Sequence, residues 1–215
     1  MKCLLCNQNI RHIPQFYELI LLKNPEKYIC EFCEQQFEKI SKNHCISCCK
    51  SDINGICDDC KQWKAKGIFI NHQAIFKYNS AMQEFFSQYK FTGDYRLHKI
   101  FQHHFMKFDK TWTVVPIPLS QKRYQERGFN QVSAFLTYTK FTNLLMKSDS
   151  VKQSSLSRSE RLNSKNTFAV KENVQIPPKI ILIDDIYTTG ATLIHASEAL
   201  KNAGAKDIRT FSLCR

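Results

Sequence analysis

The stretch IILIDDIYTTGAT, residues 180–192, decides the fold. Four consecutive aliphatic residues run directly into two carboxylates, and a threonine-rich loop with a single glycine follows. A continuous aliphatic run is typical of a strand that is covered on both faces in a parallel sheet. Residues 191–203 show helical spacing of aliphatic positions, and Gly204 is well placed to end that helix. The sequence therefore predicts an α/β fold with a mostly parallel sheet, in which this loop joins the carboxyl end of a strand to a helix N-terminus.

The loop has the chemistry of a phosphate site. Main-chain N–H groups and threonine hydroxyls can surround a phosphate at the positive end of the helix dipole. The loop residues concerned are Thr188, Thr189, Gly190, Ala191 and Thr192. The carboxylates of Asp184 and Asp185 would repel that phosphate, so we expect them to face ribose hydroxyls or Mg²⁺ just beyond it. A phosphorylated sugar satisfies both requirements, whereas the alternative reading makes these residues simple helix caps.

This stretch resembles the phosphoribosyl-diphosphate-binding motif of type I phosphoribosyltransferases. The resemblance implies that the acidic pair, Asp184 and Asp185, holds the ribose hydroxyls and acts in catalysis, while the loop takes the 5-phosphate. It also implies that Mg²⁺ accompanies the diphosphate. Transferases of that group for 6-oxopurines tend to carry an acidic residue where Thr188 stands, so the resemblance argues against such an acceptor.

Two further segments are basic. VVPIPLSQKRYQERGFNQV, residues 114–132, begins as a short strand and then presents Lys122, Arg123 and Arg127 before a helix. Guanidinium groups suit a diphosphate or a nucleic-acid backbone, although a solvated charge cluster is the alternative. KQSSLSRSERLNSKNTF, residues 152–168, is serine-rich and is predicted to be a loop. Type I phosphoribosyltransferases close such a loop over the diphosphate, a role that the resemblance gives to Arg158 or Arg161. A disordered surface loop is the alternative.

The first 60 residues contain four Cys-x-x-Cys units. Their members are Cys3, Cys6, Cys30, Cys33, Cys45, Cys48, Cys57 and Cys60. Two such units complete the tetrahedral shell of one zinc ion, so sequential pairing predicts two four-thiolate structural sites. Spacing alone leaves the pairing open, and a redox dithiol is the alternative. Cys49 and Cys214 fit no unit, and His44 could replace a cysteine.

Cysteine content and charge both change near residue 60. The first 60 residues hold nine of the ten cysteines and 7 Lys/Arg against 8 Asp/Glu, while the rest holds 24 against 11. We therefore predict a zinc-ribbon domain over 1–65 and a basic second domain over 66–215. Such a charge excess attracts phosphate-rich partners. No stretch reaches the ~18 apolar residues of a membrane span, and cysteine pairs used for metal fit a cytoplasmic protein.

Between these regions the sequence predicts a strand near 68–78 and two helices within 80–107, separated by the residues TGDY.

Three features together, the cysteine units, PIPLSQKRYQERGFNQ and IDDIYTTGAT, resemble the ComF family over almost the whole chain. The resemblance implies a double zinc ribbon followed by a phosphoribosyltransferase-like domain that takes part in DNA uptake during natural transformation. A competence helicase and other DNA-uptake proteins are implied as partners.

Two hypotheses about activity stay open. One is a phosphoribosyltransferase, active or not, with an unidentified acceptor. The other is a non-catalytic adaptor that binds single-stranded DNA, to which the basic excess after residue 60 points.

Overall fold

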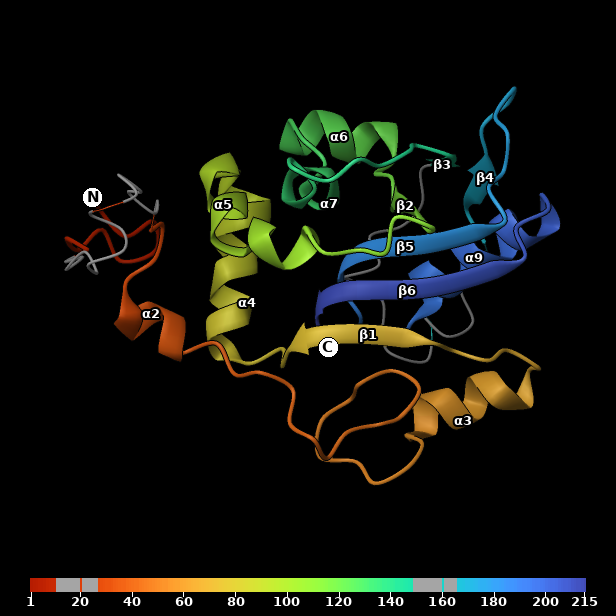
Figure 1. Cartoon of the computed structure of the whole chain (residues 1–215), viewed down its shortest axis with the longest axis horizontal. Coiled ribbons are helices and arrows are strands. Elements are labelled where there is room, and N and C mark those ends of the chain that lie inside the picture. Colours follow the sequence, from red (N-terminus) through yellow and green to blue (C-terminus); the bar gives the residue numbers. More distant parts are fainter. Residues whose placement is uncertain (11–19, 21–26, 149–159, 161–165) are drawn as a thin grey trace.

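The computed structural model describes residues 1–10, 20, 27–148, 160 and 166–215. Its centre is a four-stranded sheet in the order β1-β6-β5-β2, with every neighbouring pair parallel (Figure 1). The strands are β1 (His72–Phe76), β2 (Thr113–Pro116), β5 (Lys179–Ile186) and β6 (Asp207–Cys214). The predicted fold class, a mostly parallel α/β sheet, is confirmed.

Strand β5 shows why the aliphatic run forms the centre of the sheet. It lies between β6 and β2, and its side chains alternate between the two faces. Ile181 and Ile183 belong to one buried cluster, whereas Ile180 and Leu182 belong to another on the opposite face. Complete burial of each such side chain stabilises the fold by about 1.5–3 kcal/mol. A strand buried on both faces needs this unbroken run of Ile and Leu.

Helices cover the first face of the sheet. α4 (Ser80–Ser87) continues into a π-helical turn, Gln88–Thr92, and Gly93 ends it with a φ of 72°. α5 (His98–Phe101) follows between two 3₁₀ turns, Tyr95–Leu97 and Gln102–Phe105, and α7 (Gln131–Phe135) completes the layer. Aromatic side chains from these helices fill the core beneath them. The two predicted helices and their break near TGDY are confirmed.

The second face is covered by α9 (Ala191–Asn202) and by part of the cysteine-rich head. α3 (Asp58–Ala65) belongs to this head. Four cysteines, Cys45, Cys48, Cys57 and Cys60, lie in one buried cluster with Leu182 and other sheet residues. Figure 1 shows α3 running beside β1 on the lower side of the sheet. The predicted division at residue 65 coincides with the end of α3, but the core continues across it.

The remaining elements are short, and two features differ from the sequence-based expectation: the basic segment is helical, and the acidic pair belongs to a strand. α2 (Glu31–Gln35) lies in the first part of the head, and β3 (Leu145–Lys147) pairs antiparallel with β4 (Phe168–Val170). The basic segment is itself a helix, α6 (Gln121–Arg127), which Gly128 ends at a φ of 76°. Asp184 and Asp185 are part of β5 and precede the loop instead of lying in it. Among the described residues, no helix is long and apolar enough to cross a membrane.

Candidate functional site

The site lies at the carboxyl edge of the sheet. β2 and β5 are parallel neighbours with Pro116 opposite Ile183, so the segments that follow the two strands meet at this edge. They enclose a pocket of 550 Å³, within the range of about 300–1,000 Å³ usual for small-ligand sites. The predicted site residues that line it are Asp184, Asp185, Thr188, Thr192, Arg123 and Arg127. The structure therefore brings the acidic pair, the threonine loop and the basic helix together.

The two carboxylates occupy different environments. Asp185 forms an ion pair with Lys90, with 2.7 Å between Oδ2 and Nζ. Asp184 accepts a hydrogen bond of 2.9 Å from the main-chain N–H of Asp185. Burial, together with the charge of Asp185, raises the pKa of Asp184 to about 7. This carboxyl therefore sits near half-protonation at neutral pH, and a cation in the pocket would favour its ionised form.

The loop after β5 is supported from below by an aromatic side chain. Gly190 has a φ of 85°, in the left-handed region, and a Cβ there would meet the hydroxyl of Tyr187. Both the backbone angle and the close approach require glycine. Thr189 and Ala191 are buried behind the pocket wall, whereas Thr188 is exposed. Within the described part of the chain, the main-chain N–H groups of Thr189, Gly190 and Ala191 have no hydrogen-bond acceptor.

The basic residues of α6 have different surroundings. Arg123 pairs with Glu126 at 2.6 Å, and Arg127 donates to the Oε1 of Gln131 at 2.9 Å. Burial lowers the pKa of the Arg127 guanidinium, which nevertheless stays charged at any physiological pH. Lys122 is exposed on α6 and is not among the residues that line the pocket. Arg158 and Arg161 lie outside the described residues.

Sequence reasoning missed two lysines of this pocket. Lys90 comes from the π-helical turn and Lys147 from β3, more than 30 residues away from the acidic pair in either case. Burial lowers the pKa of Lys147, and the nearby carboxylates Asp184 and Asp185 raise it. Neither lysine stands in a motif, so no spacing in the sequence pointed to them. With Arg123 and Arg127 they bring the cations of the pocket wall to four against two carboxylates.

Aromatic side chains border the same pocket. Tyr78 and Phe91 line it and are 44% and 74% exposed. Tyr124, on α6 beside Arg123, is 54% exposed. In the 80–107 region Phe85 and Phe101 are buried in the core, whereas Phe91, in the π-helical turn, is exposed.

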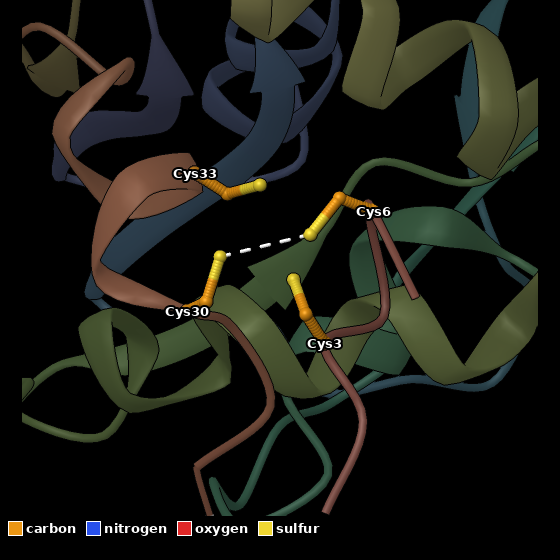
Figure 2. A group of neighbouring side chains, drawn as sticks. All are labelled: Cys3, Cys6, Cys30 and Cys33. Atoms are coloured by element: carbon orange, nitrogen blue, oxygen red, sulfur yellow. Dashed lines mark hydrogen bonds between the residues drawn. The ribbon is translucent and has the colours of Figure 1, made fainter. Parts of the chain in front are cut away.

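The cysteines form two groups with the predicted sequential pairing. One holds Cys3, Cys6, Cys30 and Cys33, and the other holds Cys45, Cys48, Cys57 and Cys60. Within each group all sulfur atoms lie within 4.8 Å of one another. Figure 2 shows the first group converging on a common centre, with 3.7 Å between the sulfurs of Cys6 and Cys30.

These sulfur positions fit zinc. Four thiolates about 2.3 Å from a tetrahedral ion lie about 3.8 Å apart. The 3.7 Å in the first group and the 3.5 Å between Cys48 and Cys57 in the second are close to that separation. An all-thiolate shell leaves no position for water, so an ion in either group would be structural. His44 belongs to neither group, and its Nδ1 lies 2.6 Å from the carbonyl of Ser41.

Comparison with known proteins identifies the family. The protein-family model of the phosphoribosyl transferase domain matches residues 146–215, which run from β3 through the loop to the end of β6. Over 220 residues the chain is 45% identical to the Competence protein ComFC of Streptococcus pneumoniae, and the match covers 100% of both chains. The chain belongs to the ComF family.

Two further relatives agree with this assignment. The Competence protein ComFC of Bacillus subtilis is 34% identical, over 99% of this chain and 94% of its own. Competence protein F of Haemophilus influenzae is 26% identical, over 86% of this chain and 84% of its own. The resemblance drawn from the cysteine units and the two motifs is thus confirmed, and this ComF chain carries a phosphoribosyltransferase domain behind its paired cysteine groups.

Proposed function

We propose that this ComF chain takes part in DNA uptake during natural transformation and that its phosphoribosyltransferase domain binds phosphoribosyl diphosphate with Mg²⁺. The competence names of these three relatives support the first part. One observation supports the second: a single 550 Å³ pocket joins the acidic pair, the threonine loop and four cationic side chains.

Each part of the proposed ligand finds chemically suitable groups. The main-chain N–H groups of Thr189, Gly190 and Ala191, which have no acceptor among the described residues, lie at the N-terminus of a 12-residue helix and suit the 5-phosphate. Asp184 and Asp185 suit the ribose hydroxyls, with Mg²⁺ held nearby and partly through water. The guanidinium groups of Arg123 and Arg127 suit the diphosphate, since each offers several N–H donors in one plane.

Calorimetric titration with phosphoribosyl diphosphate and Mg²⁺ tests the proposal. Wild-type protein should bind, and the double variant Asp184→Asn with Asp185→Asn should bind at least about tenfold more weakly, which is 1.4 kcal/mol. Lys122→Ala, outside the pocket lining, is the matched control and should leave the affinity unchanged. Absence of binding by the wild type, with both cysteine groups metallated, would refute ligand binding at this site.

A second function, binding of single-stranded DNA as an adaptor, is favoured by a different observation. Exposed rings at Tyr78, Phe91 and Tyr124 stand beside the arginines of α6, and bases stack on such rings while cations follow the backbone. The double aspartate variant should keep wild-type DNA binding if the two functions use separate groups. Equal loss of both would show one shared site. A competence helicase is the protein partner that we expect for this role.

A further inference from the structure

Helix α3 connects the second cysteine group with the phosphate loop. Cys57 precedes the first residue of α3, Cys60 lies in its first turn, and Trp63 follows three residues later on the same side. The indole of Trp63 is 3% exposed. Its Nε1–H donates a hydrogen bond of 2.8 Å to the carbonyl of Thr189. The ring also packs against Ala191 and Ile194 at the start of α9.

A second connection runs through Arg215, the residue that follows β6. Its Nε and Nη2 lie 3.4 and 3.5 Å from the sulfur of Cys48, and Nη2 lies 3.2 Å from Oδ2 of Asp59. The guanidinium carbon is 4.9 Å from the ring centre of Tyr187. Tyr187 is the side chain that lies beneath Gly190. Arg215 therefore contacts both the sulfur group and the aromatic support of the loop.

Both connections reach the loop through groups other than the main-chain N–H groups of Thr189, Gly190 and Ala191. Trp63 holds the carbonyl of Thr189, and Tyr187 fills the space under Gly190. Within the described residues, those three N–H groups have no hydrogen-bond acceptor. Holding a carbonyl inward orients the adjoining peptide groups, because each peptide unit is planar. The loop can then present its N–H groups to an anion without a change of shape on binding.

The second group is also the more dependent on its ion. All four of its cysteines are buried, whereas Cys6 of the first group is exposed. Without an ion the four buried sulfurs lose the bonds that tie them together, and small cysteine-rich units commonly unfold when metal is removed. The first half of α3 is fixed to the rest of the head through Cys57 and Cys60. Loss of the ion would thus release the helix that carries Trp63.

We propose that metal in the second cysteine group sets the shape of the phosphate loop, and so its affinity for phosphoribosyl diphosphate, through Trp63 and Arg215. This inference rests on the function proposed above. Because coupling between two sites is reciprocal, phosphoribosyl diphosphate must also raise the affinity of the second group for its metal ion. The first group lies at the far side of the helical layer from α9 and makes neither contact (Figure 1).

The test compares Trp63→Phe with wild type in the full chain loaded with zinc. Phenylalanine keeps most of the packing but removes the N–H donor, which leaves the Thr189 carbonyl unpaired. We expect phosphoribosyl diphosphate with Mg²⁺ to bind about tenfold more weakly, with zinc content unchanged at two ions per chain. Trp112→Phe, which changes the other tryptophan, should bind as wild type does. Unchanged affinity in a fully metallated Trp63→Phe protein would overturn the proposal.

A second measurement keeps the coupling testable even if wild type does not bind the ligand. In Trp112→Phe protein, Trp63 is the sole tryptophan. A zinc-selective chelator should release the two ions in two phases, and one of these phases should change the fluorescence of Trp63. Amide hydrogen exchange at residues 187–192 should become faster in that phase and not in the other. In protein that binds the ligand, that phase should slow in its presence. If wild type does not bind phosphoribosyl diphosphate, the proposed function is refuted but the coupling is not. If metal release leaves amide exchange of the loop unchanged, the coupling is refuted.

Discussion

The carboxyl of Asp184 allows the electrostatics of the pocket to be measured without any ligand. Burial and the charge of Asp185 raise its pKa from 3.8 to about 7. A group whose pKa is raised in the folded state holds its proton there after the unfolded chain has lost it. Its stabilising contribution is therefore complete below about pH 4 and is lost as the pH rises through 7.

The size of this loss follows from the pKa difference. Between pH 5.5 and 8 the folded protein binds more protons at Asp184 than the unfolded chain does. Integrated over this interval, the difference in bound protons is about 1.5 pH units, which corresponds to a loss of about 2 kcal/mol in unfolding free energy. Asparagine does not titrate and can keep the hydrogen bond from the N–H of Asp185. The variant Asp184→Asn should therefore gain about 2 kcal/mol in unfolding free energy relative to wild type over this pH interval.

Urea unfolding followed by tryptophan fluorescence, with zinc present and Mg²⁺ absent, measures this difference at several pH values. The cysteine ligands titrate in both proteins, so their contribution cancels in the comparison. Asp185→Asn is the matched comparison: it removes the charge that helps to raise the pKa of Asp184, so its stability should depend less on pH between 5.5 and 8 than that of wild type. The difference in unfolding free energy between wild type and Asp184→Asn could also stay constant from pH 5.5 to 8. That result would show that this carboxyl is not forced toward its neutral form.

Three other predictions concern separate parts of the molecule. Gly190→Ala should lower the unfolding free energy by about 2 kcal/mol or more in the same urea assay, because φ is 85° and the new methyl meets Tyr187; wild-type stability would contradict the strained geometry. Replacing Arg123 and Arg127 by Ala should reduce the slope of log affinity against log salt for single-stranded DNA by about 1–2, and an unchanged slope would remove them from phosphate contact. Elemental analysis should give two zinc ions per chain and one for Cys45→Ser; one ion in wild type would mean that a cysteine group is not a zinc site.

The parts of the fold that the sequence predicted are those governed by local patterns. The aliphatic run before Asp184 is typical of a strand buried on both faces, and the two-residue cysteine gaps favour closely spaced sulfurs. The break between α4 and α5 followed from Gly93 and its polar neighbours. Each of these signals lies within about ten residues of chain.

The parts that sequence could not supply depend on contacts between distant segments. Trp63 and Thr189 are 126 positions apart, and nothing near either residue indicates the other. Lys90 and Lys147 line the same pocket as the acidic pair because a π-helical turn and the antiparallel pair β3–β4 place them at the sheet edge. The sequence placed the basic residues before a helix and did not predict α6 itself, because its charged residues lack an apolar stripe; none of its residues is buried. The predicted roles of the site residues stay predictions until ligand binding is measured.

The buried cluster that joins Cys45 and its partners to Leu182 limits where this protein can be divided into fragments. A fragment started at residue 66 would lose part of the cover of one sheet face and present aliphatic side chains to water, an arrangement that favours aggregation. Recombinant work on the transferase half should therefore begin upstream of Cys45. For the same reason, a lineage could not easily exchange its second cysteine group for an unrelated module without also redesigning the sheet.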